Sequence, residues 1–224
     1  MIVAKASNIA LQEIGTVDKD TEARLISNLA ELGLTLTYPC LETNEGDLIT
    51  ESPAICQFLA ASGSAPHLRG ETALEQAQVD QWMQFLKSQT LGLAKALSGA
   101  VYGTIDMSAD EHAYITSLLK ENLKTLNNAL KAKLWMCGGD KPTFADYFLV
   151  ICTAELMQCV MDTNIRNSLN NLNAHFKKVA VLDEVKGRLG NLKQGKKQMM
   201  PACLATKKEA APAASKNNKK PYKK

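Results

Sequence analysis

Residues 138–160, with the sequence GGDKPTFADYFLVICTAELMQCV, decide the fold class because they predict a helix buried on every side. Their apolar residues cover all faces of a helix rather than one stripe, so the helix must lie inside a bundle. Thr143 and Asp146 have the spacing of a capping box just before the apolar run. A buried helix start needs such a cap, since each unpaired N–H costs about 1 kcal/mol or more. We therefore assign Thr143 and Asp146 a structural capping role.

The chain around this helix is also predicted to be helical, from residue 71 onward. Residues 71–97 and 109–133 each carry one apolar stripe at helical spacing, which predicts two antiparallel helices packed together. Shorter helices are predicted at residues 166–179 and 182–192. The stripes consist of Val79, Trp82, Met83 and Leu86 in the first helix, and Ile115, Leu119, Leu123, Leu126 and Leu130 in the second.

The first 65 residues predict a different, α/β unit. Strands are expected at residues 2–6, at residues 34–42 with an interruption at Pro39, and at Leu48 and Ile49. A helix at residues 20–32 should bury Ala23, Ile26, Leu29 and Ala30 on one face. A second helix at residues 52–61 should begin with Ser52 as N-cap and Pro53 in its first turn.

Three segments follow from these patterns. Residues 1–65 form the α/β unit, residues 71–195 form an all-helical domain, and a loop rich in glycine and proline separates them. Residues 196–224 hold nine lysines and one acid, a local charge of 9 − 1 = +8, against a net charge of +3 for the 224-residue chain. This lysine-rich tail is predicted to be disordered, because its composition cannot bury enough apolar surface to offset chain entropy.

Composition narrows the functional classes. No apolar run approaches the roughly 20 residues needed to cross a bilayer, so we expect a cytoplasmic protein without membrane contact. The six cysteines and three histidines are scattered without metal-ligand spacing. We therefore expect no metal site, and interpret the cysteines as reduced, buried thiols.

Several motifs, in this order, resemble the cytosolic glutathione transferase superfamily. They are Pro39 before a middle strand, the helix start ESPAI at residues 51–55, and the G-x-x-x-T-x-A-D pattern at residues 139–146. Within that superfamily, AQVDQWMQF at residues 77–85, the segment 138–153 and the lysine-rich end are most similar to the glutathione-transferase-like domain of the gamma subunits of eukaryotic translation elongation factor 1. Scaffold proteins of aminoacyl-tRNA synthetase complexes have related modules.

The resemblance implies a glutathione site and also gives a reason to doubt its activity. Ser7 would be the thiol-activating hydroxyl, Glu51 and Ser52 would hold the γ-glutamyl group, and Pro39 would present its neighbouring backbone to the tripeptide. Residues 8–33 are too few to complete such a site. In the superfamily this stretch holds a helix, a strand and a second helix, which together need roughly 35 to 40 residues. We expect an incomplete site, in which Ser7, Glu51 and Ser52 serve as structural residues at element ends.

We therefore predict a non-enzymatic docking module without a cofactor, whose partners are protein subunits of the elongation factor 1 complex. The alternatives are a scaffold of a synthetase complex and a catalytic glutathione transferase that uses Ser7. Trp82, Trp135 and Tyr102 are candidate interface anchors. We predict that the lysines of the tail make weak contacts with the phosphate backbone of RNA or with the ribosome. Base stacking is not expected, since Tyr222 is the only aromatic residue of the tail. Monomer and dimer both stay open.

Overall fold

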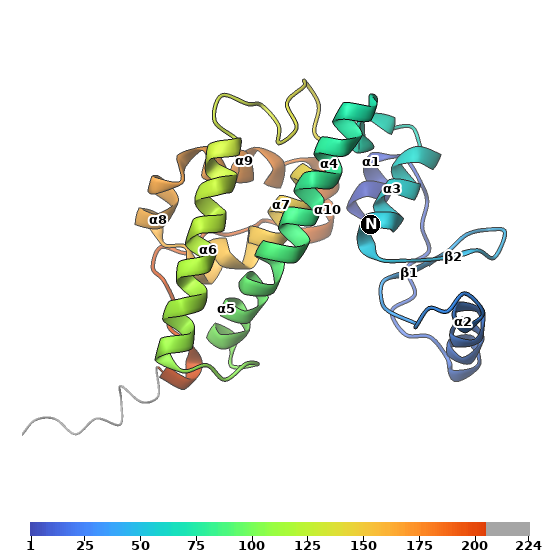
Figure 1. The fold of residues 1–224 in the computed structure, drawn as a ribbon, viewed down its shortest axis with the longest axis horizontal. Coiled ribbons are helices and arrows are strands. Elements are labelled where there is room, and N and C mark those ends of the chain that lie inside the picture. The colour runs from blue at the N-terminus through green and yellow to red at the C-terminus, as the bar shows by residue number, and fades with distance from the viewer. Residues whose placement is uncertain (205–224) are drawn as a thin grey trace, which may run out of the picture.

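The computed structural model describes residues 1–204, which form a small N-terminal unit beside a larger helical body (Figure 1). Within the N-terminal unit the elements are α1 (Ile2–Ala6), α2 (Lys19–Glu31), β1 (Cys40–Glu42), β2 (Leu48–Thr50) and α3 (Ser52–Ser62). A short 3-10 turn, η1 (Pro66–Arg69), leads into the body. The described residues contain one sheet of two antiparallel strands, with Cys40 opposite Thr50 and Glu42 opposite Leu48.

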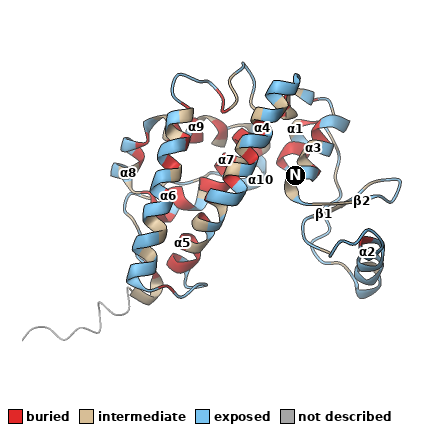
Figure 2. Ribbon diagram, in the orientation of Figure 1, coloured by how far each residue is buried: buried red, intermediate tan, exposed pale blue. Residues whose placement is uncertain are grey.

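The helical body is built around α7, as the sequence predicts. Its elements are α4 (Ala73–Phe85), the π-turn η2 (Leu86–Leu91), α5 (Gly92–Tyr102), α6 (Ala109–Ala129), α7 (Phe144–Glu155), the π-turn η3 (Leu156–Val160), α8 (Thr163–Ser168), α9 (Asn170–Ala180) and α10 (Asp183–Leu189). The chain descends through α4 and α5 and returns along α6 (Figure 1). α6 packs against α5 and η2, whereas α4, which carries most of the first predicted stripe, packs against α7. Figure 2 shows the buried residues concentrated on α7 and on the inner faces of its neighbours.

Two expectations about the body need refinement. The helix predicted at residues 71–97 is one helical stretch that continues to Tyr102 and contains the π-turn η2. α7 is not buried on every side. Ile151 lies on the side of α7 that reaches the surface and is 43% exposed. For α6 the predicted stripe is confirmed at Leu119, Leu123, Leu126 and Leu130, which are buried.

The N-terminal unit differs more from its prediction. Residues 2–6 form a helix, not a strand: the Ser7 N–H donates to the Val3 carbonyl at 2.9 Å, and Ile2 and Val3 pack into the core beside α3 and α10. The strand expected at residues 34–42 is reduced to β1, since the residues before the cis Tyr38–Pro39 bond have no strand beside them among those described.

The starts and faces of the two longer N-terminal helices also change. Ser52 is the first residue of α3 rather than its N-cap, and Glu51 occupies the cap with a left-handed φ of 67°. In α2 the buried side chains are Leu25 and Leu29, so of the four residues expected inside only Leu29 is buried. Asp18 caps α2 by accepting from the Thr21 N–H at 2.8 Å.

The beginning of the predicted tail is bound to the body. The Gly195 N–H donates to the Met157 carbonyl at 2.8 Å, and the Met199 N–H donates to the Cys159 carbonyl at 2.7 Å. These acceptors lie in the π-turn η3, and the buried Arg166 guanidinium adds a bond to the Gly195 carbonyl at 2.5 Å. The prediction of disorder is therefore wrong for residues 196–204, while residues 205–224 lie outside the described part.

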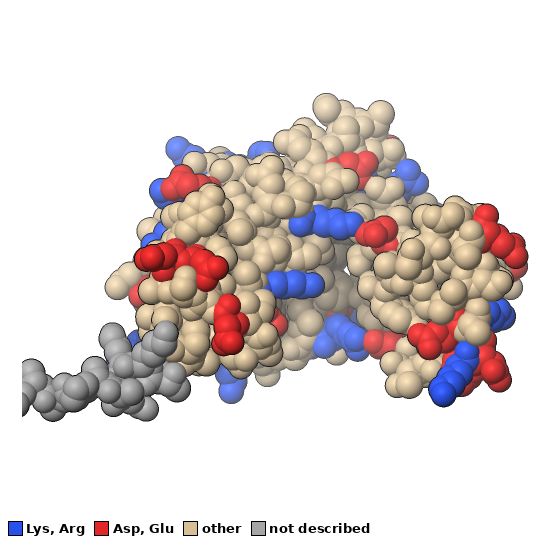
Figure 3. Space-filling model, turned by 60° about the horizontal axis from the view of Figure 1, so that its bottom comes forward, with Lys and Arg blue, Asp and Glu red and all other residues tan. Residues whose placement is uncertain are grey.

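The two units meet through an apolar contact and a polar seam. α1 packs against α7 and α10, and its Ile2 and Val3 belong to the same core cluster as Val185 of α10. Exposed ion pairs join Lys87 to Glu51 at 2.5 Å and Arg188 to Glu13 at 2.6 Å. Figure 3 shows basic side chains facing acidic ones across the notch between the units. No helix among residues 1–204 is long and apolar enough to cross a bilayer.

Candidate functional site

Ser7, the candidate thiol-activating residue, lies at the C-terminal end of α1 with its side chain inside the protein. Only 1% of the residue is exposed, and Oγ has no hydrogen-bond partner among the described groups. Its carbonyl accepts from the Ser64 N–H at 2.9 Å, and a Cβ at Gly63 would lie 2.4 Å from that oxygen. The hydroxyl is thus buried and is not presented to a ligand.

The other candidate glutathione residues do come together. Pro39 directly precedes β1 and Glu51 directly follows β2, and the pairing of Cys40 with Thr50 places both at the same end of the sheet. Ser52 follows as the first residue of α3, whose N–H groups could favour an anionic group. The Glu51 carboxylate is already paired with Lys87 of the helical body. Pro39, Glu51 and Ser52 thus lie at one end of the sheet, and the ion pair ties Glu51 to the second unit.

Five of the described thiols and the buried Tyr147 have pKa values raised above their ordinary range. Burial raises the pKa of Cys137 to about 11 and that of Cys152 to about 12. Burial also raises the pKa of Cys40, Cys56 and Cys159. The pKa of Tyr147 is raised by burial and by its hydrogen bond to Glu184, at 2.5 Å. Because the thiolate is the reactive form of cysteine, these thiols are poor nucleophiles at neutral pH.

Thr143 and Asp146 form the predicted capping box of α7, at the centre of a larger buried network. The Asp146 carboxylate accepts from the Thr143 N–H at 2.8 Å and from the Met136 N–H at 2.7 Å, and His175 Nε2 lies 2.7 Å from it. Sequence analysis missed Met136 and His175, which approach only through the packing of a loop and of α9. The four residues hold three segments together.

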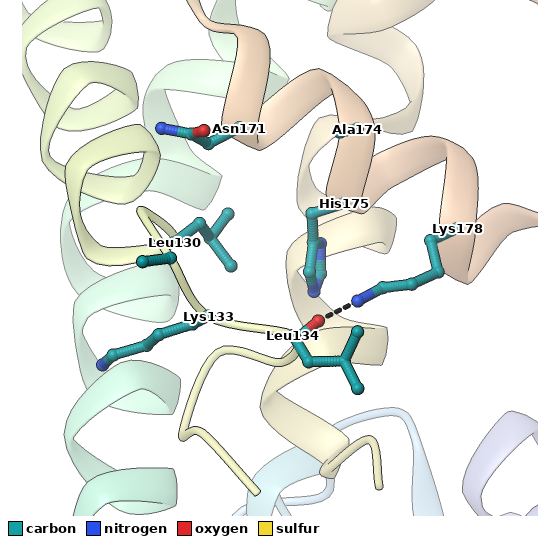
Figure 4. Close-up of a pocket in the computed structure, with 8 residues that line it drawn as sticks. Leu130, Lys133, Leu134, Asn171, Ala174, His175 and Lys178 are labelled. Atoms are coloured by element: carbon teal, nitrogen blue, oxygen red, sulfur yellow. Dashed lines mark hydrogen bonds between the residues drawn. The ribbon is translucent and has the colours of Figure 1, made fainter. Parts of the chain in front are cut away.

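A half-open pocket of about 210 Å³ lies beside this network (Figure 4). Lys178 points across it, donates to the Leu134 carbonyl and lies 3.8 Å from the centre of the Trp135 ring. Burial lowers the pKa of this amine. These contacts of Lys178 hold α9 against the loop that carries Leu134 and Trp135. Its lining comprises Leu130, Ala132, Lys133, Leu134, Asn171, Ala174, His175 and Lys178.

The candidate interface anchors lie in different environments. Trp135 is buried, and Trp82 is half-buried with its ring edge-on to Phe85 at 5.8 Å between centroids. Tyr102 is 54% exposed at the end of α5. Of the three aromatic residues, Tyr102 alone presents a large surface to a partner.

A groove of about 390 Å³, which we call the α2 groove, opens on the N-terminal unit. It is formed by α2 and the segment that follows it, and is lined by Glu22, Ile26, Ala30, Leu34, Thr35, Leu36 and Tyr38. Ile26 is 50% exposed, Leu34 47% and Tyr38 63%. Neither this groove nor the pocket beside His175 is lined by Ser7, Pro39, Glu51 or Ser52.

Comparison with known proteins gives two kinds of relative. Residues 94–189 match the family model described as glutathione S-transferase, C-terminal domain. The chain is 28% identical over 155 residues to elongation factor 1-gamma of Artemia salina, covering 69% of this chain and 35% of that protein. It is also 28% identical over 202 residues to the glutathione S-transferase-like protein FUS3 of Gibberella fujikuroi, covering 85% and 90%.

Among solved structures, the glutathione-transferase-like domain of elongation factor 1-gamma from Saccharomyces cerevisiae superimposes with a TM-score of 0.74 at 16% identity. The match covers 89% of this chain and 91% of that domain, and at this identity it concerns the fold. The chain spans about a third of the length of the Artemia relative.

Proposed function

Because this chain has the glutathione-transferase-like fold, we propose that it is a non-catalytic docking module of a translation elongation factor 1 complex. The observation that carries the proposal is the enclosed hydroxyl of Ser7. A thiol-activating group must lie within about 3 Å of the sulfur it serves, and Ser7 Oγ is covered by the protein. The similarity to proteins named elongation factor 1-gamma supports the choice of complex.

The arrangement of the other candidate residues supports a site that has lost its activity rather than a working enzyme. Pro39, Glu51 and Ser52 sit where the family resemblance places the peptide-binding residues, yet the Glu51 carboxylate is engaged by Lys87. Binding without an activating group would lower no reaction barrier, since catalysis requires interactions that strengthen in the transition state. A cytoplasmic location follows from the proposal.

The test is affinity purification of the full chain from its own cells, combined with a glutathione conjugation assay. We expect elongation factor 1 subunits among the recovered proteins, identified by mass spectrometry, and no conjugation of a chloronitrobenzene acceptor above the uncatalysed rate. Recovery of aminoacyl-tRNA synthetases in their place would instead assign the chain to a synthetase complex.

A catalytic glutathione transferase is the second candidate, favoured by the similarity to the FUS3 protein over 90% of that protein's length. Conjugation that disappears in a Ser7→Ala variant would establish it and overturn the docking proposal. Retention on glutathione resin without turnover is the result expected of a vestigial site.

A further inference from the structure

We propose that the α2 groove binds a basic amphipathic helix of a partner protein. The inference deepens the proposed docking function and rests on it, because it names the surface and the chemistry of the partner. It starts from a conflict between sequence and fold: Ile26 and Ala30 belong to the face of α2 expected inside, and both are exposed.

Two apolar rows form the walls of the groove. Ile26 and Ala30 are four residues apart and share one face of α2. Leu34, Leu36 and Tyr38, together with Thr35, line the groove from the segment that follows the helix. Each wall thus contributes apolar side chains to the groove.

The helix that carries one wall is weakly integrated into the protein. Leu25 and Leu29 are buried, but they do not belong to the main core cluster. Figure 2 shows α2 exposed over most of its surface, and Figure 1 shows it apart from the helical body. A helix with so little of its own core stands to gain from a partner that covers its outer face.

Single exposed apolar side chains are common on protein surfaces, but contiguous ones mark interaction sites. Tyr114 and Val181 are as exposed as Tyr38, yet they line neither of the two pockets described above. The α2 groove combines exposure with concavity, which is the geometry that accepts the apolar face of a helix.

The charge around the groove indicates which charge a partner should carry. Residues 10–50 contain eight carboxylates and two basic side chains, a net charge of 2 − 8 = −6. One of the two bases, Arg24, is held by Glu42 through two bonds of 2.7 and 3.0 Å, and Glu22 itself lines the groove. Acidic side chains edge the lobe at the right of Figure 3. Lysine or arginine beside the apolar anchors would therefore steer and orient the partner.

Two other occupants fit the groove less well. Residues 205–224 carry seven lysines and one acid, but Tyr222 is their only large apolar side chain, so they lack anchors for two apolar walls. A second copy would bring its own N-terminal unit, where residues 1–70 hold nine acids and four bases, a net charge of 4 − 9 = −5. Like charges on both partners oppose that contact.

The experiment measures binding of synthetic helical peptides to the full chain by fluorescence anisotropy. The probe is a fluorescein-labelled leucine–lysine amphipathic helix of about 18 residues, roughly five turns. One control peptide has glutamate in place of lysine, and another has the same composition as the probe in an order without an apolar face. We expect the probe to bind at least about tenfold more tightly than either control, with an affinity that falls as salt rises.

Variants locate the binding site. Ile26→Asp combined with Leu34→Asp should reduce probe affinity about tenfold or more, while Val181→Asp, at an equally exposed site on the body, should leave it unchanged. Circular dichroism establishes that each variant is folded. Glu22→Lys leaves the apolar walls intact and should weaken the leucine–lysine peptide while strengthening the leucine–glutamate peptide, whereas Glu121→Lys on α6 should do neither.

Several results would overturn the inference. They are equal binding of both charged peptides, no effect of the groove variants, a dimer that dissociates in the Ile26→Asp/Leu34→Asp variant, or a large gain in probe affinity when residues 205–224 are deleted. The last two would assign the groove to a second copy or to the chain's own tail.

The same variant separates this inference from the proposed function. If the wild-type chain recovers elongation factor 1 subunits and the groove variant recovers them equally well, the groove assignment fails and the docking function stands. If the wild-type chain recovers none, the proposed function fails whatever the peptides show.

Discussion

A serine can activate a thiol only when its hydroxyl reaches the ligand, and the hydroxyl of Ser7 is buried at the end of α1. A buried hydroxyl without a partner carries an uncompensated desolvation cost. Ser7→Ala should therefore leave stability unchanged or raise it by up to about 1 kcal/mol, measured by urea unfolding. A loss of more than about 1 kcal/mol would show that Oγ makes a bond that stabilises the fold. Thr153→Ala, which removes a buried hydroxyl bonded to the Leu149 carbonyl at 2.7 Å, is the matched control and should destabilise.

At the scale of elements, several helices begin with a capping box, and the burial of each box sets how much it contributes to stability. The capping box of α7 is buried and shared with Met136 and His175, whereas the box of α6, formed by Ser108 and Glu111, lies in solvent. Asp146→Ala would leave the N–H groups of Thr143 and Met136 without acceptors in the interior. We expect a loss of about 3–5 kcal/mol, against about 1 kcal/mol for Ser108→Ala.

Urea unfolding of the two variants checks this difference. A wild-type-like midpoint for Asp146→Ala would mean that the loop before α7 rearranges to supply other acceptors. Equal losses for both variants would contradict the argument from burial.

The exposed helix starts predict how stability depends on acid. Hydrogen bonds from their own helix starts lower the pKa of Asp18, Glu75 and Glu111 below the ordinary values of 3.8 for Asp and 4.5 for Glu. A carboxylate with a lowered pKa in the folded state contributes stability above the unfolded-state pKa, and the contribution is lost as pH falls through the folded-state pKa. The unfolding midpoint should therefore drop as the pH falls below about 4.5.

The matched variant replaces Glu75 and Glu111 by Gln, which keeps a capping acceptor and removes the charge. Its midpoint should fall less steeply between pH 6 and pH 3 than that of the wild type. An unchanged slope would assign the acid sensitivity to other carboxylates.

At the scale of the whole molecule, the junction between the units depends on apolar packing more than on its ion pairs. Exposed pairs such as Lys87–Glu51 and Arg188–Glu13 contribute roughly 0–1 kcal/mol each, since water and salt screen them. Ile2→Ala removes a buried side chain from the common core and should cost about 2–5 kcal/mol. Lys87→Ala combined with Arg188→Ala should cost less than about 2 kcal/mol, and less still in high salt.

Calorimetry distinguishes the two mechanisms. One transition should persist in the Lys87→Ala/Arg188→Ala variant, because α1 still links the units. Separation into two transitions in that variant would mean that the charged seam, rather than the apolar core, couples the N-terminal unit to the body.

Much of the helical body was predictable because its signals are local. The stripe of α6, the capping box of α7 and the order of the helices depend on spacings within one segment, and the expected resemblance to the glutathione-transferase-like domain of elongation factor 1-gamma is confirmed. Pro39, Glu51 and Ser52 could be selected from sequence because a motif marks them. The domain boundaries at residues 65 and 71 and the ligand roles of these residues stay predictions.

Sequence alone thus determined the main helices of the body, the capping box of α7 and the fold class, since periodicity and capping are properties of neighbours in the chain. Tertiary structure decided what each face meets. The five residues 2–6, four of them apolar, have no period that separates helix from strand, and packing against α3 and α10 selected the helix. The enclosure of Ser7, the approach of His175 to Asp146, the bound segment 196–204 and the open face of α2 all depend on residues distant in sequence, which no local pattern encodes.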